Sequence, residues 1–242
     1  MKNTISNTFG ITKKEYLSYF SSPIAYIYIT TFLVAVNWIF FRSFFLVGQA
    51  DMRQFFGIAP WIFLFFIPAV SMGKWSEEKK QGTLEILFTL PIVDRTIVIA
   101  KFLASLALVI TAILLTFPIA ATVSIVGDPD WGQIVAGYFG MTMLGAAYLS
   151  VGLAISASTK NQIVAFILTV AANFLILVLG TPLILGGRGG LVMSAISYLS
   201  FIPHYDSIAR GVIDISDIVY YCSVIAFFLF INLKILDRKA RT

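Results

Sequence analysis

The stretch TIVIAKFLASLALVITAILLTFPIAATVSIV, from Thr96 to Val126, contains a single charged residue, Lys101. A helix needs about 20 mostly apolar residues to cross the hydrocarbon core of a bilayer. This stretch is therefore long enough to span a membrane with residues to spare. We expect Lys101, near its start, to extend its ammonium group to the membrane interface, and we expect Pro118 to kink the helix.

The rest of the chain has the same apolar character. Of its 242 residues, 59% are hydrophobic and 12% are charged, whereas soluble domains carry about 25% charged residues. The mean hydropathy is +0.91. These values predict an all-α membrane protein with a single transmembrane domain, residues 1–242. Six transmembrane helices are expected, at about residues 24–47, 55–72, 96–126, 133–157, 163–185 and 218–236.

Two segments outside these spans are expected to lie at the membrane surface. Residues 1–22 form an N-terminal interfacial segment, in which the mixed charged and apolar residues 11–21 predict a short amphipathic helix that ends at Ser22-Pro23. This segment lacks the pattern of a cleavable signal, so we expect the first span to remain as an anchor. The apolar run Leu191–Ile202 would be about 18 Å long as a helix, too short to cross about 30 Å of hydrocarbon. It predicts a re-entrant outer segment between spans five and six, broken at Pro203.

The basic residues are divided unevenly between the two sides of the six expected spans. Only four of the 17 fall on one side, namely Arg42, Arg53, Arg188 and Arg210. By the positive-inside rule, the other side is cytoplasmic and holds both termini. The net charge of +5 therefore indicates orientation and not nucleic-acid binding.

Cysteine and histidine are too scarce in this chain to form a metal site. The chain has one cysteine, Cys222, and one histidine, His204. A cluster of thiolate or imidazole ligands is therefore excluded, and we expect no catalytic residue, cofactor or metal ion in this chain.

The segment between spans two and three, KWSEEKKQGTLEILFTLPIVDR at residues 74–95, is longer and more charged than a simple turn. Gly82-Thr83 offers a flexible joint and a helix N-cap. Residues 84–90 predict one or two helical turns, which Pro91 ends. Such a helix could transmit force from a partner to both attached spans, or it could be a solvated turn at the headgroup boundary.

This segment resembles the cytoplasmic signature of ABC-2 type permeases, through Glu77, Glu78, the run Gly82-Thr83-Leu84-Glu85 and the closing Pro91. Three further stretches resemble the gliding-motility-type (GldF-like) branch of that family. They are FSSPIAY at 20–26, APWIFLFFIPA at 59–69 and RGVID at 210–214. The resemblance extends from about residue 12 to residue 240.

The resemblance implies a transport subunit of the bacterial inner membrane. Two six-span permease chains, identical or different, would work with two cytoplasmic ABC ATPase subunits that bind ATP and Mg, and with an auxiliary membrane protein that has a large outer domain. The loop between spans two and three would be a coupling helix, and residues 156–162 a smaller second contact. The implied ATPase-coupling residues are Glu77, Glu78, Gly82, Thr83, Leu84, Glu85 and Lys160. The chain has no G-x-x-x-x-G-K-[ST] phosphate-binding loop, which agrees with ATP hydrolysis on another chain.

Two other classes of protein are alternatives. A membrane-embedded enzyme would use His204 and Asp206 as an acid–base pair in the outer loop, although no candidate nucleophile accompanies them. An ion-coupled secondary carrier would need ionisable residues deep in the membrane, and the expected spans have almost none. The same scarcity favours an amphiphilic or lipid-linked substrate over passage of a strongly charged one, and we expect the transporter to export it.

Overall fold

The structure, a computed structural model, describes residues 2–47, 51–85, 93–181, 190 and 196–239. Every regular element within these ranges is an α-helix, which confirms the all-α fold class. The helices in chain order are α1 (Lys2–Phe20), α2 (Pro23–Val47), α3 (Arg53–Ser71), α4 (Gly73–Gln81), α6 (Asp94–Leu114), α7 (Phe117–Val126), α8 (Trp131–Ser156), α9 (Gln162–Val178), α12 (Phe201–Ala209) and α13 (Ile215–Lys239).

Prolines set two of the helix boundaries where the sequence predicts them. The break after α1 falls at residues 21–22, and α2 begins at Pro23. The path of α6 and α7 is interrupted at residues 115–116, just before Pro118. Proline has no N–H to donate, and its ring excludes the carbonyl four residues earlier. The expected disturbance of this helix by Pro118 is therefore confirmed.

Among the residues that the structure describes, five helical paths are long and apolar enough to cross a membrane. They are Pro23–Phe44, Arg53–Gln81, Asp94–Val126, Trp131–Ser156 and Ile215–Asp237, and they correspond to the expected spans one, two, three, four and six. The fifth expected span corresponds to α9, which has 17 residues and so lies at the lower limit of about 17 for a spanning helix. Residues 182–185 of that span lie outside the described residues, so the six-span arrangement stays a prediction.

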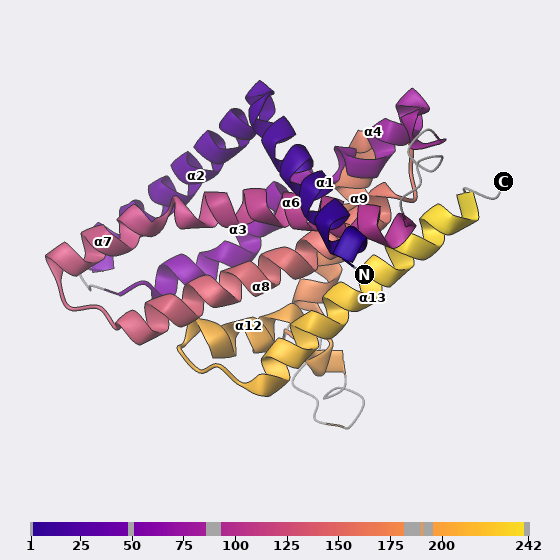
Figure 1. Cartoon of the computed structure of the whole chain (residues 1–242). Helices are drawn as coiled ribbons and strands as arrows, with labels where there is room; N and C mark the ends of the chain where they lie inside the picture. The colour runs from indigo at the N-terminus through magenta and orange to yellow at the C-terminus, as the bar shows by residue number, and fades with distance from the viewer. Residues whose placement is uncertain (1, 48–50, 86–92, 182–189, 191–195, 240–242) are drawn as a thin grey trace.

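The core of the protein forms around α8, which packs against α3, α6, α9, α12 and α13. Small residues let its neighbours approach closely. A Cβ added at three of its glycines would collide with side chains of other helices: Gly137 with Phe56, Gly140 with Ile208 and Gly152 with Ser71. Figure 1 shows α3, α6 and α8 running side by side, with α2 and α13 on opposite flanks.

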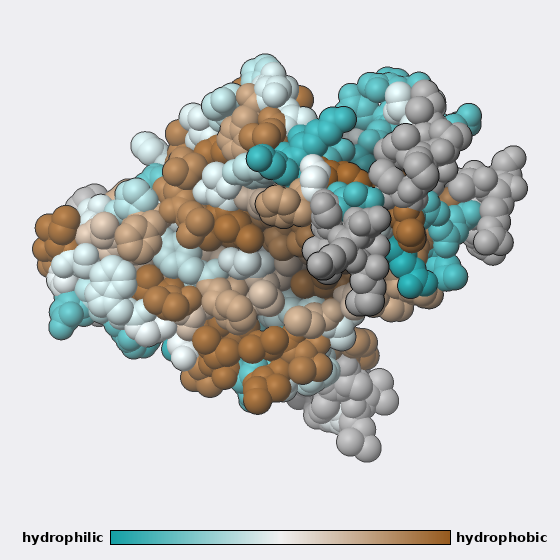
Figure 2. Space-filling view, viewed as in Figure 1, coloured by the Kyte–Doolittle hydropathy of each residue, from teal (hydrophilic) through white to brown (hydrophobic). Residues whose placement is uncertain are grey.

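The two flanking helices leave most of their apolar surface uncovered. Only 28% of the apolar window of α2 and 17% of that of α13 is buried within the chain. Lipid would cover such surfaces in a membrane. Hydrophilic residues gather instead at the end of the molecule that carries α4 (Figure 2), where Figure 1 also places the C-terminal end of α13.

The outer segment differs in one detail from the expectation. Residues 191–195 lie outside the described residues, and the chain breaks at residues 199–200, before α12 begins at Phe201. The prediction of a break at Pro203 is wrong. Pro203 lies in the first turn of α12, where its missing N–H would have no helical partner in any case.

Candidate functional site

The junction of α3 and α4 is held by a serine from the end of α8. The backbone at Met72 is helical, with φ −56° and ψ −40°, so α4 continues the path of α3. The Ser156 hydroxyl accepts hydrogen bonds from the backbone N–H groups of Trp75 and Ser76, both at 3.2 Å, and donates to the Met72 carbonyl at 2.8 Å. Ser156 therefore satisfies N–H groups in the first turn of α4 and fixes α4 to α8.

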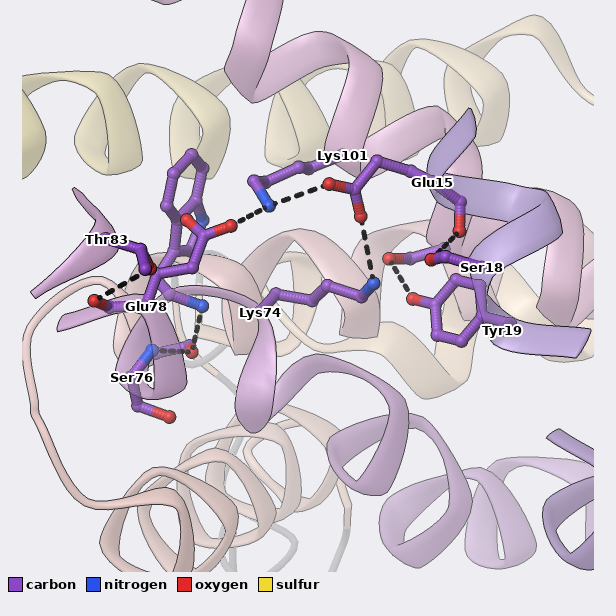
Figure 3. Close-up of polar contacts among 11 residues, drawn as sticks. Glu15, Ser18, Tyr19, Lys74, Ser76, Glu78, Thr83 and Lys101 are labelled. Atoms are coloured by element: carbon purple, nitrogen blue, oxygen red, sulfur yellow. Dashed lines mark hydrogen bonds and ion pairs between the residues drawn. The ribbon is translucent and has the colours of Figure 1, made fainter. Parts of the chain in front are cut away.

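Lys101 of α6 lies at the centre of an ion-pair network that joins three helices (Figure 3). Its Nζ is 3.1 Å from Glu15 Oε1 of α1 and 2.5 Å from Glu78 Oε1 of α4. The second Glu15 oxygen is 3.3 Å from Lys74 Nζ, also in α4. The Lys101 side chain is 3% exposed. Its ammonium group is thus covered by α1 and α4, which supply its counter-charges, and the expectation that it lies at the depth of the membrane interface stays a prediction.

The charges of this network balance within the protein. Burial of an unpaired ammonium group would cost several kcal/mol, and the Glu15 and Glu78 carboxylates offset that cost for Lys101. Burial by itself raises the pKa of the Glu15 carboxyl. Lys101 and Lys74 lower this pKa by more than burial raises it, so it lies below the ordinary value. Glu15 is therefore ionised near neutral pH, and the network holds α1, α4 and α6 in one relative position.

Aromatic rings pack against both lysines of the network. Lys74 Nζ is 3.8 Å from the centroid of the Tyr19 ring, and Lys101 Nζ is 5.2 Å from that of the fully buried Trp75. Cations are attracted to ring faces at such distances. The Tyr19 hydroxyl in turn lies 2.8 Å from the hydroxyl of Ser105 in α6. The contacts among α1, α4 and α6 thus combine charge, ring and hydroxyl interactions.

Two of the three acidic residues of the implied coupling signature, Glu77 and Glu78, belong to α4 and not to a loop. Glu77 is exposed and accepts a hydrogen bond from the Gln81 amide at 3.4 Å, whereas Glu78 belongs to the ion-pair network. The two side chains therefore lie in different surroundings: Glu77 is open to solvent, and Glu78 points inward. An internal role for Glu78 follows from its contact with Lys101.

The remaining signature residues lie directly after α4. Gly82 adopts φ +73°, in the left-handed region that glycine occupies without steric cost. The Thr83 hydroxyl donates to the Glu78 carbonyl at 3.3 Å. Leu84 is buried, and Gly82, Thr83 and Glu85 are exposed. Residues 86–90 of the expected helix, and Pro91, lie outside the described residues, so the N-cap role of Thr83 stays a prediction.

The second implied contact lies at the same end of the molecule. Lys160 is exposed in the connection between α8 and α9. The neighbouring Asn161 side chain accepts from the backbone N–H of Ile163 and begins α9. Gln162 then lines one cavity together with Lys74 and Glu77. The structure thus brings the two implied coupling segments close together.

The contact between α12 and α13 contains a buried histidine. His204 Nδ1 is 2.7 Å from Asp217 Oδ1, its Nε2 is 2.9 Å from the Tyr198 carbonyl oxygen, and its ring stacks on Tyr220 with centroids 3.9 Å apart. The carbonyl can only accept, so Nε2 carries a proton. The pairing of His204 with Asp206 is wrong, because Asp217 takes that place and ties α12 to α13. Within the described residues, no group of three or more His, Cys, Asp or Glu side chains could hold a metal ion.

Most of the chain matches a known protein family. Residues 15–234 match the family described as ABC-2 family transporter protein. The chain belongs to the ABC-2 transporter family. As a member it is a membrane-embedded permease and a transport subunit, not an enzyme. No curated protein matches this ABC-2 permease significantly.

Sequence reasoning about this ABC-2 permease missed Glu15 as a member of the site, and it missed the contacts of Lys74 and Ser156, although both lie at the start of implied coupling segments. Their contacts join residues that are 59 to 86 positions apart in the chain. The periodicity of apolar residues within a helix does not predict contacts between such distant residues. One signal was present, since Lys101 is the single charge in a long apolar stretch. An ionisable residue within such a stretch is expected to have a partner.

Proposed function

We propose that this chain is the membrane-spanning permease subunit of an ATP-driven exporter of an amphiphilic substrate in the bacterial inner membrane. It would cross the membrane six times, with both termini in the cytoplasm, and belong to the GldF-like branch. The family match and the five membrane-crossing helical paths support the proposal.

The coupling element would be the end of α4 and the segment that follows it, which consists of the turn at Gly82 and the helical residues 83–85. The observation that carries this assignment is the continuation of the helical path from α3 through Met72 into α4, Arg53–Gln81. A force applied to the turn would move α4, and α4 is tied to α8 by Ser156 and to α6 and α1 by Lys101. Movement at the turn would therefore reach several membrane-spanning helices at once.

The proposal includes partners. Two cytoplasmic ABC ATPase subunits, which bind ATP and Mg, would contact the exposed Thr83 and Glu85, with Lys160 as a second contact. Glu77, which is exposed and also lines a cavity beside α1, would lie at the edge of this contact. Leu84, being buried, would support the turn from inside. A second permease chain, identical or different, would complete the translocation pathway, and an auxiliary membrane protein with a large outer domain would join the complex.

Affinity purification of the tagged chain from its native membrane, followed by mass spectrometry and an ATPase assay, tests this function. The wild-type chain should bring down an ATPase in fixed stoichiometry. The double variant Glu77→Lys/Glu85→Lys reverses two exposed charges and should lose most of that ATPase without loss of folding. The matched control Asp128→Lys changes an exposed residue in the turn between α7 and α8 and should retain it.

A wild-type chain that purifies without any ATPase would contradict the proposed function. Equal ATPase recovery with the double variant and the control would instead leave the permease assignment standing and refute the coupling assignment.

A further inference from the structure

A cavity of about 760 Å³ lies at the end of the molecule that carries α4. Its walls come from α1 and α2 on one side and from α3, α4 and α9 on the other, with Lys101 and Leu108 contributed by α6. Sites for small molecules are concave and usually measure about 300–1,000 Å³. The cavity has the size of such a site.

One part of the cavity is apolar and open to the side of the molecule. Ile24 and Ile27 of α2 and Phe65 of α3 line it, and they are 68%, 64% and 59% exposed. These residues belong to two of the helical paths that are apolar enough to cross a membrane. The opening therefore faces the region that lipid chains occupy, and an apolar chain could enter from the bilayer without crossing water.

The other part of the cavity is charged, with three carboxylates and two ammonium groups. The lining residues are Glu15, Glu77, Glu78, Lys74 and Lys101. Both ammonium groups are already paired, with Glu15 and Glu78 (Figure 3). Glu77 lies within 4.0 Å of no cation in the part of the chain that the structure describes, and its hydrogen-bond donor is the neutral Gln81 amide. The charged part thus contains three carboxylates and two ammonium groups, so the charge of one carboxylate is not balanced by them.

We propose that this cavity binds an amphiphile whose headgroup carries an ammonium group, with the headgroup at Glu77 and the apolar chain between α2 and α3. The assignment rests on the proposed function, because it names the chemical class of the substrate. An ammonium group would balance the excess carboxylate, whereas an anionic headgroup would meet three carboxylates with both lysines already neutralised. Charge complementarity therefore selects the cationic class.

Spin-label spectroscopy on the full chain, in nanodiscs of phosphatidylcholine and without any ATPase, tests the assignment. The probes are hexadecylamine and hexadecyl sulfate, each with a nitroxide near the end of the chain. The wild-type chain should immobilise the ammonium probe with about tenfold higher relative association than the sulfate probe. Glu77→Gln should reduce this preference at least threefold, and Glu77→Lys should abolish it.

Two further variants separate the cavity from general attraction to the protein surface. Ala69→Trp places a bulky ring at a lining position of α3 that is exposed, and it should release the ammonium probe. Asp128→Asn removes a distant exposed carboxylate and should leave the preference unchanged.

Equal association of the two probes, or a preference that survives both Glu77→Gln and Ala69→Trp, would overturn the assignment. The assignment would also be overturned if a second copy of the chain closed the cavity to both probes. Such closure would be detected as a cross-link between the two copies at position 69. Because no ATPase is present in this measurement, its failure is distinct from failure of the proposed coupling to ATP hydrolysis.

Discussion

Replacement of Lys101 by methionine would remove the charge at the centre of the network while keeping a long apolar side chain. The change leaves Glu15 with Lys74 and leaves Glu78 without a cation among the ion pairs of the described residues. Loss of one partner of a buried ion pair costs about 3–5 kcal/mol. Because both carboxylates remain 25% exposed and water can solvate them in part, we expect about 2–3 kcal/mol of destabilisation, below the fully buried range.

Thermal unfolding in detergent, followed by tryptophan fluorescence, measures this effect. For a chain of this length each kcal/mol corresponds to about 2–4 °C in Tm, so Lys101→Met should unfold about 4–12 °C below the wild type. Lys13→Met is the matched control, because Lys13 is exposed on α1. The double variant Lys101→Met/Glu78→Gln should be less destabilised than the sum of its single variants, since both break the same contact.

A Tm for Lys101→Met within about 1 °C of the control, well below the shift expected for a buried pair, would refute the reasoning. Additive effects of Lys101→Met and Glu78→Gln would refute it too, because residues in direct contact should couple.

Other features of the structure give further predictions. Ser156→Ala removes the hydroxyl that bonds the N–H groups of Trp75 and Ser76 and the carbonyl of Met72. It should lower the free energy of unfolding, measured by chemical denaturation, by about 1–3 kcal/mol. Gly82→Val forces a branched residue to φ +73° and should cost about 1–2 kcal/mol, whereas Gly82→Asn should cost less. His204→Phe leaves Asp217 buried without its partner and should lower Tm, and Asp217→Asn should restore part of the loss in that background. Because the pKa of Glu15 is lowered in the folded protein, its carboxylate stabilises the fold above the unfolded-state pKa of 4.5. This stabilisation should be lost as the pH falls below that value. In an acid titration of the free energy of unfolding, Glu15→Gln should not show this loss.

The fold was largely predictable from sequence because its main determinants are local. A long apolar stretch is a membrane span whatever surrounds it, and prolines at positions 23 and 118 disturb a helix by their own geometry. The left-handed turn at Gly82 agrees with the flexible joint expected there. The exception is Pro203, which was read as a helix breaker although proline is tolerated in a first turn.

The candidate site was less predictable because it forms through tertiary contacts. Glu77 and Glu78 are neighbours in sequence, yet one faces solvent and the other Lys101, a difference that depends on how α4 packs against α6. The ammonium group of Lys101 was expected to reach the interface. The packing of α1 and α4 against α6 explains why it lies 3% exposed between two carboxylates. Such partners come from distant segments, and a single sequence does not report them.

Cysteine cross-linking at position 85 tests the central claim, that the turn after α4 docks on an ATPase. Cys222 is the single cysteine, so Glu85→Cys can be placed in a Cys222→Ser background and treated in native membranes with a short thiol-reactive cross-linker. We predict a cross-linked product that contains a second chain with an ATP-binding phosphate loop, and no such product from Asp128→Cys. Equal yields from the two positions, in membranes that retain the transport ATPase activity, would contradict the account.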